Sequence, residues 1–122
     1  MKLLTIQTIK ELRGNISIIE KILPFEIKRI YYIYNVDANE IRGGHKHKDT
    51  VQFLVSVVGS CKIKVINKDT QTDKEVLLDS PEAGLLLESE DWHQMYDFSS
   101  DCLLLVLASS EYNKNNYILE PV

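Results

Sequence analysis

Arginine and histidine are both scarce in this sequence. The 122 residues include 14 basic side chains, and only three of them, Arg13, Arg29 and Arg42, are arginines. The formal net charge is −4, so the chain lacks the basic surplus with which a nucleic-acid-binding surface neutralises phosphates. We therefore expect no nucleic-acid partner. The negative net charge still allows a small anionic ligand, because a few arginines in a pocket outweigh a mild overall charge at short range.

Cysteines and long apolar runs are also few. Cys61 and Cys102 are too few for a disulfide framework, and each lies in an apolar run, where a free thiol packs as a small hydrophobic group. The apolar run at the amino terminus is interrupted by Gln7 and Lys10, which leaves it too short for a signal sequence or a membrane span. We expect a cytoplasmic protein without membrane contact. Residues 1–122 fit a single domain around one core.

Short apolar segments, separated by turn residues, dominate the rest of the chain. Cys61, Ile63 and Val65 alternate with lysines, which is typical of a half-buried strand, and the polar run 67–75 reads as the turn that follows it. A helix is only weakly indicated, over residues 8–13. Many short strands without a linker or repeat predict an all-β sandwich or barrel. The other expected strands are 27–34, 51–58, 74–79, 84–88, 92–98 and 102–108.

Two of the three histidines form a His-x-His pair. In an extended strand, His45 and His47 point to the same face and Lys46 points away. Such a pair is either a site with two adjacent imidazoles or a pair of solvent-facing loop residues. Gln52 and Gly59 follow His47 at the intervals at which the metal-binding cupin motif has a Glu and a Gly. The spacing therefore favours a site on a cupin scaffold.

The metal ligands of that motif are only half present. Gln52 replaces the carboxylate, and Met95 stands where the third histidine belongs. An amide and a thioether are poor ligands for a hard or borderline divalent ion, so we expect no metal. His93 keeps one alternative open, because in a regular strand it shares a face with Met95. A metal-dependent cupin oxygenase would then use His45, His47 and His93.

Four segments of the chain form a specific pattern: PFEIKRIYYIYN (24–35), RGGHKHK (42–48), GSCKIKV (59–65) and WHQMYDFSSDCLLLVLASSEYNKNNYI (92–118). Their most specific parts are the RGGHKHK run with Gln52, the W-x-x-M-x-DFS element and LVLAS. These segments closely resemble the sugar 3,4-ketoisomerases, small cupin enzymes that act on dTDP-4-keto-6-deoxyglucose. The likeness extends from about residue 12 to residue 118, nearly the whole chain.

The resemblance implies an enzyme with a cupin fold of the jelly-roll type that works without a metal or another cofactor. It also implies a homodimer whose amino-terminal strands swap between the subunits. The active-site histidines of the family fall on His45 and His47, its tyrosine falls on Tyr31, and its motif arginine falls on Arg42. The product would be a 3-keto sugar for the synthesis of a 3-amino-3,6-dideoxy sugar of a surface polysaccharide.

Moving a carbonyl from C4 to C3 requires proton transfer through an enediol or enediolate. Histidine suits this transfer because its free base is populated at neutral pH. We expect His47 to be the base and His45 to stabilise the oxyanion, with these two roles exchangeable. Tyr31 would relay the hydroxyl proton, because a phenol both donates and accepts.

The substrate of this reaction carries a diphosphate, for which guanidinium groups are the natural partners. We expect Arg13, Arg29 and Arg42 to bind it. We also place Gln52, Trp92 and Met95 in the substrate site, Trp92 as a stacking partner for the thymine or as a wall of the sugar pocket. A cupin module that binds its ligand without turnover is the alternative from another functional class.

Overall fold

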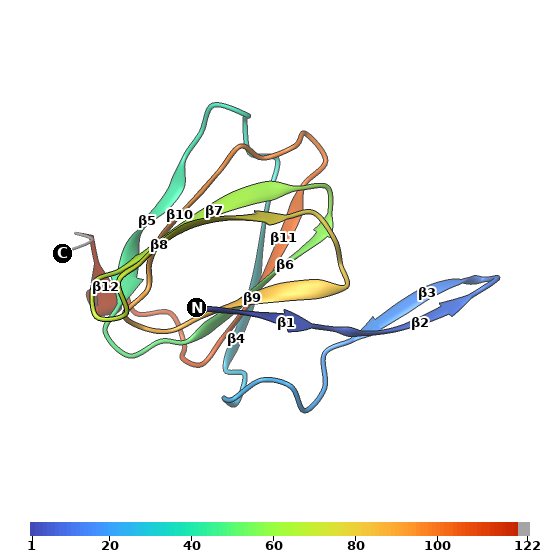
Figure 1. Cartoon of the computed structure of the whole chain (residues 1–122), viewed down its shortest axis with the longest axis horizontal. Coiled ribbons are helices and arrows are strands. Elements are labelled where there is room, and N and C mark those ends of the chain that lie inside the picture. Colours follow the sequence, from blue (N-terminus) through green and yellow to red (C-terminus); the bar gives the residue numbers. More distant parts are fainter. Residues whose placement is uncertain (120–122) are drawn as a thin grey trace.

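The computed structural model describes residues 1–119 and consists of two facing five-stranded antiparallel sheets with a projecting hairpin (Figure 1). Residues 120–122, the end of the expected domain, lie outside the described residues. The all-β expectation is confirmed. In residues 1–119, no helix has the length and hydrophobicity needed to cross a membrane.

Most neighbouring strands in each sheet are distant in sequence. The first sheet has the order β1 (Lys2–Thr5), β9 (Ala83–Leu87), β6 (Gln52–Val58), β11 (Leu103–Ala108) and β4 (Arg29–Tyr34). The second has the order β12 (Tyr117–Ile118), β5 (Arg42–His47), β10 (Trp92–Tyr96), β7 (Cys61–Asn67) and β8 (Thr72–Leu78). The expected strands are therefore present, with ends that differ by up to two residues.

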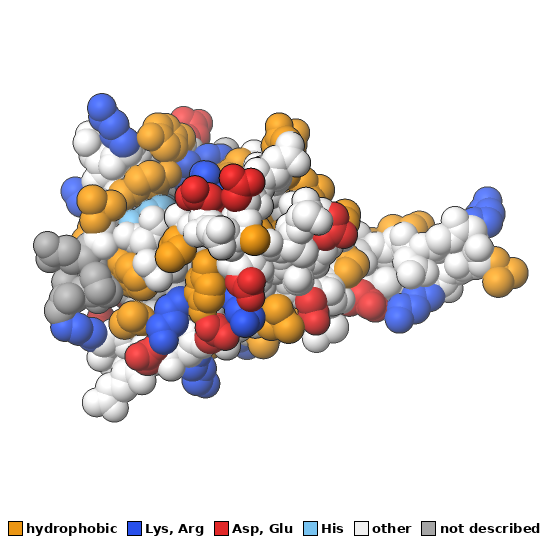
Figure 2. Space-filling model, turned by 90° about the horizontal axis from the view of Figure 1, so that it is seen from above, with side chains coloured by type: hydrophobic (Ala, Val, Ile, Leu, Met, Phe, Trp, Pro, Cys, Tyr) orange, Lys and Arg blue, Asp and Glu red, His pale blue; other side chains and the backbone are white. Residues whose placement is uncertain are grey.

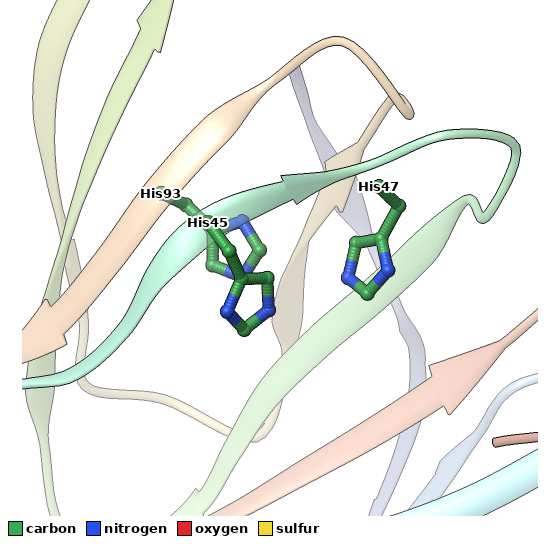
Figure 3. A group of neighbouring side chains, drawn as sticks. All are labelled: His45, His47 and His93. Atoms are coloured by element: carbon green, nitrogen blue, oxygen red, sulfur yellow. The ribbon is translucent and has the colours of Figure 1, made fainter. Parts of the chain in front are cut away.

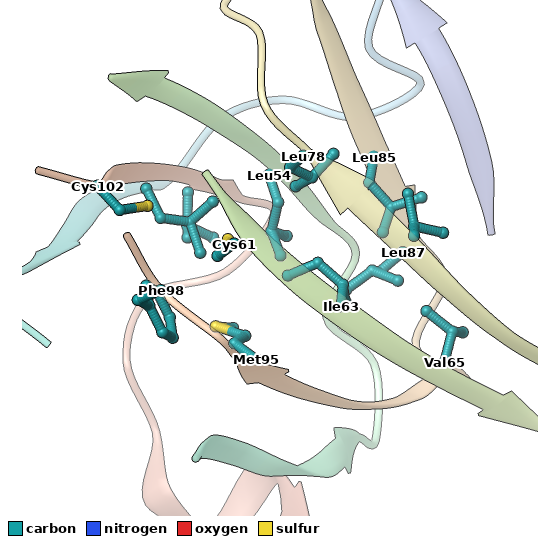
Figure 4. Close-up of a cluster of buried hydrophobic side chains, with 13 residues drawn as sticks. Leu54, Cys61, Ile63, Val65, Leu78, Leu85, Leu87, Met95, Phe98 and Cys102 are labelled. Carbon is teal, nitrogen blue, oxygen red and sulfur yellow. The ribbon is translucent and has the colours of Figure 1, made fainter. Parts of the chain in front are cut away.

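The core lies between the two sheets and is made of side chains from alternate positions along the strands (Figure 4). Cys61 and Cys102 are both buried within it, which confirms the expected packing of the two free thiols. Burial in this apolar setting raises the pKa of the Cys61 thiol to about 12. Both cysteines therefore serve as small core residues.

A second apolar layer covers the outer face of the first sheet. Phe53 and Val55 of β6 pack there with Leu86 and Leu107, and residues of the segment 19–25 lie over them. Gly84 is required in the same layer, because a Cβ at this position would overlap the Phe53 ring. This layer holds the first sheet in place, and strands β4 and β6 of that sheet carry residues of the site.

Residues 8–13 are not helical. They belong to a hairpin of β2 (Gln7–Glu11) and β3 (Gly14–Ile18), which pairs Ile9 with Ile16 and projects from the body of the molecule (Figure 2). The β-branched residues of both strands favour pairing, and Gly14 provides the φ of +130° that follows the turn. The expected helix was wrong because its short apolar pattern does not reveal the partner strand.

The polar run 67–75 does form a hairpin turn, as expected, but a shorter one. The turn occupies residues 68–71, and β8 begins at Thr72. Gln71 has a left-handed φ of 55°, and the Asn67 side chain accepts hydrogen bonds from the backbone N–H groups of Asp69 and Thr70. The rest of the polar run lies in the first half of β8. Polar residues are tolerated there because that part of the strand is exposed to solvent.

Candidate active site

The strand β5 positions the His-x-His pair. Its residues alternate between the two faces, so that His45 and His47 both point toward the interior of the sandwich. Lys46 points the other way and forms an ion pair with Glu90 at 3.2 Å. His47 is 2% exposed, whereas His45 is half-buried at the edge of a cavity. The structure thus confirms that the two imidazoles lie side by side.

The glycine pair before the histidines forms part of the strand, not a turn. Gly43 and Gly44 have left-handed φ values of +80° and +77°, and the register of β10 against β5 shifts between His93 and Gln94. A Cβ on Gly43 would lie 3.0 Å from the His93 carbonyl oxygen. The two glycines therefore allow β5 to approach β10 closely at the point where the histidines meet.

His93 of β10 completes a cluster of all three histidines in the chain (Figure 3). One ring nitrogen from each residue lies within 4.8 Å of the others. The His45 ring centroid is 5.0 Å from that of His47 and 5.1 Å from that of His93, in edge-on arrangements. His93 itself is 1% exposed, and its Nδ1 lies 3.3 Å from the Asp91 carbonyl oxygen.

Burial keeps all three imidazoles neutral. Desolvation lowers the pKa of His45 below its ordinary value of 6.5. Desolvation, aided by His45 and Arg29, lowers the pKa of His47 to about 4. Desolvation, aided mainly by His45, lowers the pKa of His93 to about 3. Both ring nitrogens of His47 and the Nε2 of His93 have no hydrogen-bond partner within residues 1–119. The cluster is therefore a set of free bases at neutral pH.

Tyr31 and Gln52 link the histidines to the opposite sheet. Tyr31 points inward from β4, and its hydroxyl oxygen accepts a hydrogen bond of 2.8 Å from the Gln52 side-chain N–H of β6. The Gln52 amide also lies beside His47, where it opposes the lowering of that pKa. Burial raises the pKa of Tyr31, partly offset by the charge of Arg29. The phenol is therefore protonated and close to the base cluster.

These groups border a cavity of about 500 Å³ that opens to solvent. Of the expected site residues, Tyr31, His45, Arg29, Arg42 and Met95 line it. His47 and Gln52 lie next to these residues in a buried position, within reach of His45 and Tyr31. The structure therefore brings together seven of the nine expected site residues.

Arg29 and Arg42 form the cationic side of the cavity. The Arg29 guanidinium lies 5.1 Å from the centre of the Tyr31 ring and 5.9 Å from that of Tyr112. Neither arginine forms an ion pair with an acidic side chain within residues 1–119. The two guanidinium groups are thus free to bind an anionic ligand.

Arg13 and Trp92 do not reach the cavity of their own chain. Arg13 lies at the turn of the projecting β2–β3 hairpin, with its side chain 93% exposed. Trp92 is on the opposite face of β10 from His93, and its indole N–H donates to the Leu119 carbonyl. The parity of β10 excludes Trp92 from the interior, whereas Met95 lies there and also contacts the core.

Two tyrosines near the carboxyl end line the cavity without having been expected there. Tyr112 stands at the mouth and is 66% exposed, and Tyr117 lies on β12 against the histidines. Both residues belong to the segment SSEYNKNNYI, which the family resemblance covered. Only the pairing of β12 with β5 shows that Tyr117 faces the cluster, because two residues are too few for a strand pattern.

The cupin scaffold commonly holds a metal, so the donor set of the cluster is relevant. Three neutral imidazoles are a set that Zn²⁺ and similar ions accept. Among residues 1–119, however, the cluster contains no carboxylate ligand, and Gln52 at the expected carboxylate position directs its amide N–H to Tyr31. The cluster therefore lacks the fourth ligand of the motif and does not fit its metal site.

A two-sheet sandwich with a His-x-His strand facing its interior defines a cupin-type protein. This fold is shared by the RmlC epimerase from Mycobacterium tuberculosis, with a TM-score of 0.79 at 17% identity, covering 94% of this chain and 66% of that one. The family model FdtA, described as WxcM-like, C-terminal, matches residues 1–121. The chain belongs to this FdtA family.

Close relatives agree with this assignment. The chain is 44% identical over 119 residues to a TDP-4-oxo-6-deoxy-alpha-D-glucose-3,4-oxoisomerase of Aneurinibacillus thermoaerophilus, covering 96% of this chain and 84% of the relative. A 3,4-ketoisomerase from Helicobacter canadensis has a TM-score of 0.90 at 41% identity, covering 98% and 90% of the two chains. A histidine-to-asparagine variant of a ketoisomerase from Thermoanaerobacterium thermosaccharolyticum, in complex with TDP-4-keto-6-deoxyglucose, has a TM-score of 0.91 at 39% identity, covering 98% and 86%. The expected family is confirmed.

Proposed function

We propose that this protein is a 3,4-ketoisomerase that converts TDP-4-keto-6-deoxyglucose to a 3-keto-6-deoxyhexose. The observation that carries this proposal is the cavity itself. Its wall holds His45, Tyr31, Arg29 and Arg42, and the buried His47 lies against His45. The relatives named for this activity share about 40% of their residues with the chain, over nearly all of its length.

Proton transfer at carbon is assigned to His47. As a free base it removes the proton from C3, and the resulting enediolate carries negative charge on O4. His45 donates a hydrogen bond to this oxygen and stabilises the charge. The conjugate acid of His47 then returns the proton to C4. A neutral imidazole can perform both steps because its protonated form is a strong enough acid to give the proton back.

Proton transfer between the two oxygens is assigned to Tyr31. The hydroxyl proton must leave O3 and arrive at O4 as the carbonyl moves. A protonated phenol can give a proton to O4 and take one from O3, which leaves the tyrosine unchanged after each turnover. The hydrogen bond of 2.8 Å from Gln52 holds the hydroxyl oxygen in place for this exchange.

Binding of the nucleotide diphosphate is assigned to the arginines. Arg29 and Arg42 lie on the cavity wall and provide planar donors for phosphate oxygens. Since Trp92 faces away from the cavity, the proposed stacking surface for the thymine is Tyr112 at the mouth. We place the enzyme in the cytoplasm. The resulting 3-keto sugar suits a subsequent aminotransferase.

We further propose a homodimer in which Arg13 enters the site of the partner. The β2–β3 hairpin forms a separate two-stranded sheet, which is marginal in water without cover. It also carries exposed Ile9, Leu12 and Ile16, as expected of a segment that a partner covers. An exchange of this hairpin would bring Arg13 to a second cavity and account for its distance from its own.

Incubation with TDP-4-keto-6-deoxyglucose in D₂O, followed by NMR of the sugar, tests the proposed function. We expect a 3-keto product with deuterium at the carbons that exchange protons. Binding of the nucleotide sugar without product or deuterium uptake would instead identify a non-catalytic binding module. The same incubation with the His47→Asn variant controls for spontaneous exchange.

A further inference from the structure

Tyr117 has no part in the proposed proton transfers, although its ring lies closer to His45 than any other ring does. Its ring centroid lies 4.6 Å from that of His45, and the two planes are inclined by only 13°, which is a stacked arrangement. It also meets His47 edge-on, at 5.0 Å and 81°. One side chain thus contacts both imidazoles of the His-x-His pair.

Tyr117 is held firmly relative to the strand that carries the histidines. In the register of β12 against β5 it lies opposite His47. The preceding residue, Asn116, is a tether: its backbone carbonyl accepts from the Lys48 N–H at 2.8 Å, and its side-chain oxygen accepts from the same N–H at 2.9 Å. That oxygen also lies 3.3 Å from the Thr50 hydroxyl, which donates to it. The backbone next to Tyr117 is therefore fixed to the turn that follows the histidines.

His45 needs such a support. The terminal torsion of a histidine side chain has a broad preference, and His45 is only half-buried at the cavity edge. On its inner side it meets His47 and His93 edge-on, and neither contact restrains rotation of its ring plane as a parallel surface does. Tyr117 provides the parallel surface.

We propose that Tyr117 is a positioning residue that holds the His45 ring in the plane required for its hydrogen bond to the developing oxyanion. This inference rests on the proposed function. The aromatic surface is what acts, and the hydroxyl group is dispensable. A misplacement of about 1 Å of a catalytic group can cost about 100-fold in rate, so the contact affects turnover more than substrate binding.

The same ring shields His45 from water. Burial is the largest cause of the lowered pKa of His45, and the groups that face it are His47 on the same strand, His93 on β10 and Tyr117 on β12. Removal of the tyrosine ring exposes the imidazole to solvent. The pKa of His45 then rises toward 6.5, which provides a readout that is independent of turnover.

Three variants of the protein test this inference: Tyr117→Leu, Tyr117→Phe and Ile118→Ala. Because the chain has only three histidines, NMR titration can follow each imidazole separately. For Tyr117→Leu we expect kcat to fall about 100-fold with little change in KM, and the pKa of His45 to rise. Tyr117→Phe keeps the ring, so we expect this variant to have the parental kcat and the parental pKa of His45. Ile118→Ala weakens the same short strand and controls for loss of stability.

Two results would overturn the inference. If Tyr117→Leu keeps the parental kcat and the parental pKa of His45, the ring does not position the imidazole. If Tyr117→Phe is as inactive as Tyr117→Leu, the hydroxyl group takes part in the chemistry. Failure of the unmodified protein to isomerise the sugar would refute the proposed function instead, and the His45 titration would still report on the stacking contact.

Discussion

At the scale of single residues, the site depends on imidazoles that remain uncharged. His47 and His93 are almost completely buried, and the pKa values of about 4 and 3 follow mainly from desolvation. A base that is neutral well below pH 7 is always in its reactive form in the cell. Its conjugate acid is correspondingly strong, which assists the return of the proton to C4.

The pH dependence of activity follows from these values. A base acts only when unprotonated, so kcat/KM falls as the pH drops through the pKa of His47 in the free enzyme. For an ordinary histidine this loss is centred near 6.5, whereas here we expect a flat profile down to about pH 5 and a half-maximal value near pH 4. Initial rates measured in buffers of overlapping pH range give this acidic side of the pH profile. A midpoint near 6.5 would contradict the role of a buried His47.

Stability is expected to depend on pH in the same direction. In the unfolded chain His47 and His93 bind protons near pH 6.5, whereas in the folded protein they do so only near 4 and 3. The unfolded state therefore holds more protons between these values, and stability declines as the pH falls below 6.5. Thermal unfolding between pH 7.5 and 4.5 should show a decreasing Tm. His93→Gln, which removes one of these groups, should reduce the slope.

Replacement of the base tests the assignment of the carbon transfer. His47→Asn keeps a polar side chain of similar shape but cannot accept the proton, so we expect turnover to be lost while TDP binding is retained. Calorimetry with TDP and NMR of the sugar measure the two effects separately. Lys46→Gln on the opposite face of β5 is the matched control, and its activity should equal that of the parent. More than a tenth of parental activity in His47→Asn would identify another base.

At the scale of elements, the approach of β5 to β10 decides where the histidines meet. Both Gly43 and Gly44 are left-handed, but only at Gly43 would a Cβ press on the backbone of the neighbouring strand. At Gly44 the nearest atom is 4.0 Å away, on the flexible Gln94 side chain. A substitution at Gly44 therefore costs only the strain of the backbone conformation, whereas one at Gly43 also disturbs the close packing of the two strands.

Alanine at each glycine tests this geometry. Gly44→Ala should lose about 1–2 kcal/mol of stability, because an L residue is forced into the left-handed region. Gly43→Ala carries the same cost and also displaces β5 from β10, so we expect lower stability still and a reduced kcat. Denaturant unfolding and initial rates measure the two effects. Equal behaviour of the two variants would show that the bulge does not position the cluster.

At the scale of the whole molecule, one chain does not bring all its expected substrate ligands to one cavity. Arg13 is at the tip of the hairpin, and β4 presents Ile30, Tyr32 and Tyr34 to solvent with more than half of each side chain exposed. The apolar sheet face and the projecting hairpin support the proposed two-fold dimer, in which each hairpin would complete the partner's site.

A hybrid dimer distinguishes an Arg13 that acts across subunits from one that acts within its own chain. Arg13→Gln and His47→Asn subunits, co-expressed with different tags, give a hybrid with one intact site if Arg13 serves the partner. Its activity should then be about half that of the parent dimer, although each variant alone is weak. If Arg13 acts within its own chain, the hybrid has no intact site. An inactive hybrid would therefore refute the exchange.

The sequence alone determined the all-β class, most strands of the two large sheets and the His-x-His geometry. These features depend on local alternation along the chain, which a single strand displays without its neighbours. The resemblance to the ketoisomerases placed Tyr31, His45, His47 and Arg42 at the site, and the structure brings them together. The expectation for Trp92 was wrong: alternation along β10 puts Trp92 on the face opposite to His93 and Met95, and the pairing of β10 with β5 and β7 places His93 inside.

Only the tertiary structure decided which distant residues complete the site. His93 joins the cluster through the pairing of β10 with β5, and Tyr117 joins it through a two-residue strand at the sheet edge. The same holds for the hairpin at residues 7–18, where the pattern of one strand suggested a helix. Pairing between segments far apart in sequence is set by packing of the whole sandwich, and this information is absent from any local pattern.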